Sequence, residues 1–429
     1  MSSVTLRGGF VVTSDKISKL NIVIENEHIS EIGKNTEKGE VIDCNGLYIL
    51  PGFRDQHVHD LIGSTSEPDP DRLSKISISL AMNGVTSAKI ATTAMPFDRL
   101  ERYLRSIRDY ITSERNGKEG ARIEGVHLEG TFIRKDCSGA QPVEYVVEPR
   151  DTSAKNTLDL LNATGAIKLI NIVPDFGSDL IEYAASKNLI VGCGHSRASA
   201  NQLRDACRKG LKYIVHITNG PMGQSFKPFD GGGTYEGALT LPLFIEMIPD
   251  GYHIDMRYVS DIAERRIGQG RKHELIAITD SVFPVKNEIP QGEFEYFSVV
   301  GSANEEKSIV LVKRYKDVDG LWKKPNFTTL FGSVLSMDKA FENLLNLFSS
   351  DVLGYMIDRP ARSFEEALQL ASAMTSTNQA MLEGLTDVGV LKEGNKADIT
   401  ILSISGKGGS FRVKVMGTIV SGKLFKIGA

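Results

Sequence analysis

Two histidines stand one residue apart in the stretch PGFRDQHVHD, directly after the apolar run VIDCNGLYIL. Side chains at positions i and i+2 of a β-strand point to the same face of the strand. We therefore expect His57 and His59 to project together from a strand end. Imidazole nitrogens are common ligands of zinc and other transition metals, so this motif predicts part of a metal site.

Further histidines and acids lie in or at the end of other apolar runs. They are Glu129 in VHLEG, His195 in GCGHS, His216 in IVHITN and Asp280 in IAITD. Taken singly, each is more typical of a structural or solvated residue, and an aspartate after a strand is more often a helix N-cap. Their common position at strand ends is what indicates a shared function.

The elements that would position these residues are eight strand-like runs that alternate with helical patterns. The runs are the one ending at His59, then GVTSAKIATTA, IEGVHLEG, IKLINIVPD, LIVGCGHS, YIVHITN, DGYHIDM and LIAITDS, with helices such as FDRLERYLRSIRDYI and SANQLRDACRKG between them. Such alternation implies parallel strands. Eight parallel strands predict an α/β fold, a (β/α)8 TIM-like barrel, whose active sites gather at the C-terminal ends of the strands.

The two ends of the chain read differently from the middle. The first fifty residues and the last forty carry short β-branched runs broken by turn residues, which predict a small antiparallel sheet. We expect residues 1–50 plus 388–429 to form a small β-sandwich domain and residues 51–387 to form the barrel. Residues 308–333 depart from the barrel pattern and read as an inserted hairpin, which would either cover the pocket or serve a subunit contact.

In a barrel the C-terminal ends of the strands converge on one mouth, so the candidate residues would meet in a single pocket. Imidazole and carboxylate donors suit zinc, iron or manganese, and two such sets that share one carboxylate suit a metal pair. His127 shares a strand face with Glu129 but would lie deeper, and we expect it to support the site rather than bind metal. Cys193 is expected to be a small buried residue.

Composition restricts the classes of partner. The 50 basic residues nearly balance the 54 acidic ones, and no basic stripe with aromatic residues appears, which disfavours nucleic acid and favours a small-molecule substrate. The four cysteines are scattered, which is typical of reduced thiols. Neither a signal peptide nor an apolar run of the roughly 18 residues that a membrane helix needs is recognisable. We expect a cytoplasmic protein with no membrane partner.

The motifs HVH, HLEG, GHS, VHITN and ITD, in this order and flanked by a split β domain, resemble the amidohydrolase superfamily. More narrowly, the chain resembles the N-acetylglucosamine-6-phosphate deacetylase family. The likeness runs nearly end to end, through GVTSAKIATT, VHLEGTFI, GHSRAS, HITNGPM, DGYHID, FGSVLSMDKAF and GVLKEGNKADITIL.

The resemblance implies a ligand set and a chemistry. His57, His59 and Glu129 would form one metal site, and Glu129, His195 and His216 the other, so that one or two divalent ions are held, with zinc favoured over iron or manganese. Many amidohydrolases use a carboxylated lysine as the bridge, but Lys168 falls early in its strand, so Glu129 is expected in that role.

The reaction implied by the resemblance is metal-assisted hydrolysis of an N-acyl amide bond, with N-acetyl as the leading case, of an amino sugar or its 6-phosphate. A metal lowers the pKa of its bound water from 15.7 toward roughly 7, and Asp280 would act as general base and then as general acid. The family pattern also implies a substrate contact by His253 and a homodimer. Gln141, Asn219 and the backbone amide of Gly220 are further candidate substrate contacts.

Three departures from the family pattern bear on the substrate. Thr131 replaces a proline in HLEGTF, and Gln141 in SGAQ stands where the family has a histidine. Thr234 falls where the family arginine that pairs with the sugar phosphate is expected. Arginine matches phosphate geometry in a way that other residues do not. Lys227, in GQSFKPFDGGG, is a candidate substitute, and this segment is either a mobile lid or a surface loop.

The substrate therefore stays open between an N-acetylhexosamine 6-phosphate and another N-acyl amine or a cyclic amide. Two further alternatives are a deaminase on the same fold and a non-catalytic scaffold. The complete set of candidate ligands and the candidate base favour an enzyme over a scaffold.

Overall fold

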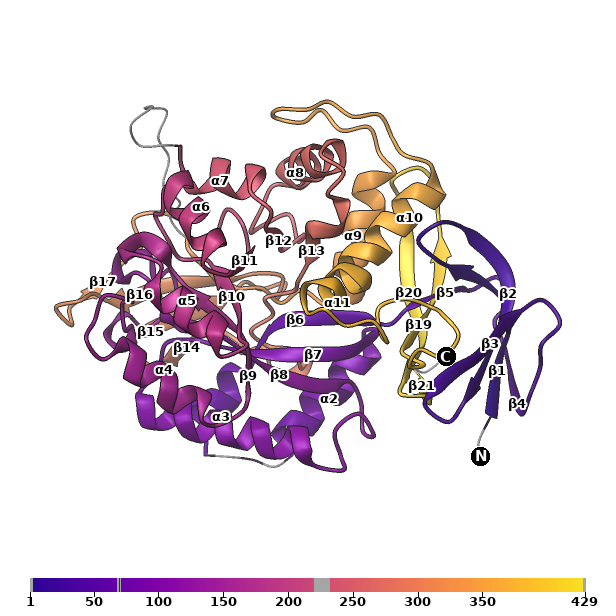
Figure 1. Ribbon diagram of the computed structural model, residues 1–429, viewed down its shortest axis with the longest axis horizontal. Coiled ribbons are helices and arrows are strands. Elements are labelled where there is room, and N and C mark those ends of the chain that lie inside the picture. Colours follow the sequence, from indigo (N-terminus) through magenta and orange to yellow (C-terminus); the bar gives the residue numbers. More distant parts are fainter. Residues whose placement is uncertain (1–2, 68, 70, 220–231, 427–429) are drawn as a thin grey trace.

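The chain folds into a barrel with a separate sheet at one side, as the sequence predicted (Figure 1). This computed structural model describes residues 3–67, 69, 71–219 and 232–426. No helix in those ranges is long and apolar enough to cross a membrane.

The barrel wall is an eight-stranded parallel sheet in which each strand pairs with the next one along the chain. Its strands are β6 (Phe53–His59), β7 (Val85–Thr92), β8 (Arg122–Phe132), β9 (Ile167–Ile172), β10 (Ile190–Cys193), β11 (Leu211–Ile214), β12 (Phe244–Met247) and β13 (Leu275–Ala277). The ring closes where the segment after β13 meets β6: the Asp280 amide donates to the His57 carbonyl at 2.9 Å, and the His59 amide to the Ser281 carbonyl at 2.9 Å.

Helices cover the outside of the barrel (Figure 1). They are α2 (Arg72–Met82), α3 (Phe97–Thr112), α4 (Ala154–Asn162), α5 (Asp179–Ser186), α6 (Ala200–Arg208), α7 (Thr234–Thr240), α8 (Met256–Gly268) and α9 (Met337–Phe348), with short α1 (Leu61–Thr65), then α10 (Phe364–Ser372) and α11 (Asn378–Leu382) joined by a π-helical turn at Ala373–Thr377. In α3 the residues Leu100, Leu104 and Ile107 recur at helical spacing and are buried against the sheet.

One predicted strand is wrong. The stretch DGYHIDM (250–256) is a turn that leads into α8, and the seventh barrel strand is β12, at Phe244–Met247. Asp250 explains the turn: its carboxylate accepts hydrogen bonds from the amides of Tyr252 and His253, both at 2.8 Å. Side chains that cap their own backbone in this way favour turns over strands.

Both chain ends contribute to the separate sheet, an eight-stranded sheet in the order β21-β20-β19-β5-β1-β2-β3, with β4 beside β1. Its strands are β1 (Ser3–Val12), β2 (Ile17–Glu25), β3 (His28–Gly33), β4 (Glu40–Asp43), β5 (Tyr48–Pro51), β19 (Ile399–Ser405), β20 (Arg412–Val420) and β21 (Lys423–Lys426). Most pairs are antiparallel, but β1 runs parallel to β4 and β5. The domain boundaries at residues 50 and 388 remain a proposal.

A third sheet is inserted between β13 and α9. It consists of β14 (Glu293–Tyr296), β15 (Val299–Ala303), β16 (Val310–Lys316), β17 (Trp322–Lys323) and β18 (Leu330–Gly332). The hairpin predicted at 308–333 is therefore part of a larger sheet that begins some fifteen residues earlier, because β14 and β15 pair with each other and β15 with β16. The Ser333 amide donates to the Asp280 carbonyl at 2.9 Å, which fixes the insert beside the barrel mouth.

Candidate metal centre

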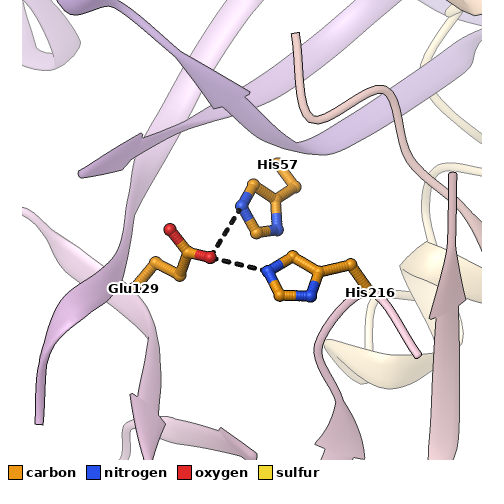
Figure 2. A group of neighbouring side chains, drawn as sticks. All are labelled: His57, Glu129 and His216. Atoms are coloured by element: carbon orange, nitrogen blue, oxygen red, sulfur yellow. Dashed lines mark hydrogen bonds and ion pairs between the residues drawn. The ribbon is translucent and has the colours of Figure 1, made fainter. Parts of the chain in front are cut away.

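The barrel brings the predicted metal ligands together around the carboxylate of Glu129. Its Oε1 lies 2.7 Å from His216 Nε2, 3.1 Å from His195 Nε2 and 3.8 Å from His57 Nε2. Figure 2 shows the rings of His57 and His216 turned toward this same oxygen. All four side chains are buried or nearly so.

The second half of the cluster lies around Asp280. Its Oδ1 is 3.0 Å from His59 Nε2 and 3.4 Å from His57 Nε2, and His59 Nε2 is 3.6 Å from Glu129 Oε2. His57 thus belongs to three groups whose donor atoms lie close enough to share an ion: one with Glu129 and His216, one with His59 and Asp280, and one with His127 and Glu246.

The donor set fits a divalent metal ion. His57 Nε2 is fully buried and has no hydrogen-bond partner within the described part of the chain. An orphaned buried nitrogen costs free energy unless something binds it, and imidazole with carboxylate donors is a set that zinc, iron and manganese accept. Lys168 is exposed on β9 and lies outside the buried cluster, whereas each oxygen of Glu129 faces a histidine nitrogen.

Backbone strain marks the same residues. His195, His216 and Asp280 have φ angles of 56°, 25° and 51°, in the left-handed region that residues other than glycine rarely adopt. Each follows the end of its strand by two or three residues. Such strain persists where the surroundings enforce it and clusters at functional sites.

Burial and neighbouring charges shift the pKa values of the residues in the cluster. Burial raises the pKa of Glu129, but hydrogen bonds with His195 and His216 outweigh it and hold that pKa well below its usual value. Burial lowers the pKa of His57, yet the hydrogen bond with Glu246 and the charges of Asp280 and Glu129 raise it to about 10. Asp280 likewise has a lowered pKa, because the neighbouring His59 and His57 outweigh its burial. The carboxylates are therefore ionised.

Two residues that support the site were missed from the sequence. Glu246, on β12, places Oε2 at 3.3 Å from His57 Nδ1. Asn171, on β9, donates to the carbonyls of Glu129 and Gly194, each at 3.2 Å, and accepts from the Gly194 amide at 2.8 Å. A charged residue inside the apolar run LFIEMIP was a signal for Glu246, since glutamate is rarely fully buried without a partner.

His127, which the sequence predicted to support the site, is fully buried beside His57. Its Nε2 lies 2.9 Å from the Tyr213 hydroxyl, and its ring packs edge-on against His57 with centroids 4.5 Å apart. Burial and the charge of His57 hold the pKa of His127 well below its usual value. Cys193 is a buried thiol whose pKa is raised by burial.

A cavity of about 810 Å³ opens above the cluster. It is lined by His59, Glu129, His195, His216 and Asp280, by three of the predicted substrate contacts, Gln141, Asn219 and His253, and by residues 325–332 of the insert. The insert thus forms one wall of the cavity.

Three further residues, Gly220, Lys227 and Thr234, were considered from the sequence in connection with substrate or phosphate binding. Gly220, Lys227 and most of the glycine-rich segment lie outside the described residues. Thr234 is buried at the start of α7, where its hydroxyl donates to the Ala198 carbonyl, and it does not line the cavity. His253 reaches the cavity from the turn before α8, with Nδ1 held 2.7 Å from Asp250 Oδ2.

The chain is similar in sequence to curated N-acetylglucosamine-6-phosphate deacetylases. The N-acetylglucosamine-6-phosphate deacetylase of Lysinibacillus sphaericus is 25% identical over 400 residues, which cover 91% of each chain. That of Bos taurus is 26% identical over 434 residues, covering 98% of this chain and 93% of the relative. No family model matches the sequence.

Among solved structures, the N-acetylglucosamine-6-phosphate deacetylase from Pasteurella multocida superposes with a TM-score of 0.76 at 18% identity, covering 99% of this chain and all of the other. At that identity the likeness concerns the fold. Sequence and fold together confirm that the chain resembles the N-acetylglucosamine-6-phosphate deacetylases, as its motifs predicted.

Proposed function

We propose that the protein is a metal-dependent amidohydrolase that removes an N-acyl group, the acetyl group in the leading case, from an N-acetylated amino sugar or its 6-phosphate. The observation that carries the proposal is the meeting of three imidazoles on Glu129 Oε1, beside Asp280, at the floor of a substrate-sized cavity.

In this proposal the chain holds one or two divalent ions, zinc in the first place and iron or manganese as alternatives. His57, His59 and Glu129 form one ligand set, and Glu129, His195 and His216 the other. When bound, the metal supplies an activated water at neutral pH and polarises the acyl oxygen.

Asp280 moves the proton. Its lowered pKa keeps the carboxylate ionised, so Oδ1 is ready to accept a proton from the attacking water as the water oxygen bonds to the acyl carbon. Asp280 then returns this proton to the amide nitrogen as the C–N bond breaks. The products are a carboxylate and a free amine.

The names of the curated relatives support an N-acetylamino sugar phosphate as substrate. Among the described residues, two cationic side chains line the cavity, Lys135 and Arg197, and they are our candidates for the phosphate in place of the arginine absent at Thr234. A second substrate class, an N-acyl amine with a larger apolar group, is favoured by Val318 and Phe327 of the insert, which line the same cavity and are 70% and 85% exposed.

We place the protein in the cytoplasm, which the four free cysteines support, and we expect a homodimer.

A hydrolysis panel tests the proposal. The metal-loaded protein is offered N-acetylglucosamine with and without 6-phosphate and a set of N-acyl amino acids, and carboxylate release is measured. We expect the highest kcat/KM for the phosphorylated sugar, and Arg197→Ala and Lys135→Ala should raise KM for that substrate alone, whereas Lys407→Ala serves as a surface control. If the metal-loaded protein hydrolyses none of these, the deacylase proposal is wrong, and the cyclic-amide hydrolase, deaminase and scaffold alternatives take its place.

A further inference from the structure

Gln141 makes two hydrogen bonds that fix the orientation of its side-chain amide. Its Oε1 accepts from the Ala94 amide at 2.8 Å, and its Nε2 donates to Glu129 Oε2 at 2.7 Å. A backbone N–H can only donate, so the oxygen of the Gln141 amide must face Ala94 and its NH2 group must face Glu129. The side chain is buried, and water does not compete freely for either bond.

The two oxygens of the Glu129 carboxylate therefore have unlike surroundings. Oε1 faces three imidazole nitrogens, of His216, His195 and His57, at 2.7, 3.1 and 3.8 Å. Oε2 faces one imidazole nitrogen, His59 Nε2 at 3.6 Å, and also accepts the hydrogen bond from Gln141.

A close backbone approach enforces this arrangement. A Cβ atom on Gly130 would lie 2.0 Å from the Ala94 nitrogen and 2.1 Å from Gln141 Oε1. The backbone of Gln141 is also anchored, because its backbone N–H donates to the Ser138 carbonyl at 3.0 Å. The donor is thus held against Glu129 by the local fold.

We infer that Gln141 is a positioning residue that makes Glu129 an unequal bridge: one ion binds tightly at Oε1 with His195 and His216, and a second binds much more weakly at Oε2 beside His59. This inference rests on the proposed function. The physical reason is that the Gln141 NH2 group uses one lone pair of Oε2 and places the positive end of its dipole where a second cation would approach.

The expected change in metal affinity follows from the free energy of this hydrogen bond. A hydrogen bond to a charged group is worth about 1.5–3 kcal/mol, and 1.4 kcal/mol corresponds to a factor of ten in Kd. The weaker ion should therefore gain roughly ten- to hundredfold in affinity when the donor is removed.

The test is a Zn²⁺ titration of the metal-stripped full-length protein in competition with a chromophoric chelator. The wild type should show one tight and one weak equivalent. Gln141→Met, which is of similar length and lacks the donor, should tighten the weak equivalent and leave the tight one within about threefold. Gln202→Met, which replaces the N3 glutamine of the capping box at the start of α6, should change neither.

A matched histidine pair keeps the test decisive if Gln141→Met folds poorly. His59→Ala should abolish only the weak equivalent, and His216→Ala should weaken the tight one. Two equally tight ions in the wild type, a tight equivalent that depends on His59, or a folded Gln141→Met with an unchanged ratio would each overturn the inference. A protein that hydrolyses its substrate yet shows equal sites refutes this inference alone, whereas a protein that binds no Zn²⁺ refutes the proposed function as well.

Discussion

Glu246 orients the ring of His57 from below the metal centre: its Oε2 lies 3.3 Å from His57 Nδ1, and its Oε1 accepts a hydrogen bond from Gln56 at 2.6 Å. Both Glu246 and His57 are fully buried. With Nδ1 engaged by a carboxylate, Nε2 is the nitrogen left to face Glu129 and Asp280. Carboxylates that hold a ligating histidine in this way usually raise its basicity and fix its tautomer.

Glu246→Gln should weaken metal binding by about 10- to 100-fold, the usual cost of losing such a partner. Chelator competition on the purified variant measures the effect. Glu236→Gln, at the start of α7, is the matched control and should bind like the wild type. Unchanged affinity in Glu246→Gln would mean that His57 needs no orienting carboxylate.

Asp280→Asn should lower kcat by about 10²–10⁴-fold, the range expected for a lost general base, while the protein keeps its metal. Steady-state rates measure the loss of kcat, and elemental analysis of the same sample measures the retained metal. Asp317→Asn is the control, because Asp317 lines the same cavity on the insert. Near-normal turnover in metal-loaded Asp280→Asn would refute the proposed proton transfer.

Metal affinity should rise with pH. In the metal-free protein the pKa of His57 is raised to about 10, so the ring is protonated across the neutral range, and a metal must displace that proton to bind. For one displaced proton, the apparent Kd should fall roughly tenfold per pH unit below pH 10. Isothermal titration between pH 6 and 8.5 in buffers of different ionisation enthalpy measures proton release. A pH-independent Kd without proton release would contradict the assigned protonation.

Gly130→Ala should destabilise the fold, because its added Cβ would meet the Ala94 nitrogen and the Gln141 oxygen at about 2 Å. Overpacking of this kind typically costs 1–3 kcal/mol. Denaturant unfolding of the metal-free protein measures the change. Gly268→Ala, at the end of α8 with open space around its Cβ position, should be nearly neutral. Equal stability of the two variants would show that the Gly130 contact relaxes freely.

The sequence predicted the barrel because most of its strands are apolar runs bounded by turn residues, and the candidate ligands stand at their C-terminal ends. It misplaced the seventh strand, since β12 has only four residues, Phe244–Met247, and the next apolar pattern, at 250–256, has a strand-like alternation that the Asp250 turn overrides.

The contacts of the side chains around the metal ligands were harder to predict from the sequence. Gln141 was expected to contact substrate, and its bond to Glu129 depends on the approach of two backbone segments at Ala94 and Gly130, which are distant in sequence from each other. Thr234 was aligned with a phosphate contact, yet the start of α7 turns its side chain toward Ala198. Such contacts follow from tertiary packing and leave no periodic signal.

We propose that the buried His, Glu and Asp cluster is a hydrolytic metal centre. The most direct test measures acetate release from N-acetylglucosamine 6-phosphate by one preparation in three states: as purified, stripped with a chelator, and reloaded with Zn²⁺, Fe²⁺ or Mn²⁺. We predict that activity is lost with the metal and returns in proportion to the metal bound, and that His216→Ala fails to recover at the same metal concentration. Activity that persists in protein shown by elemental analysis to be metal-free would mean that the cluster is not a hydrolytic metal centre.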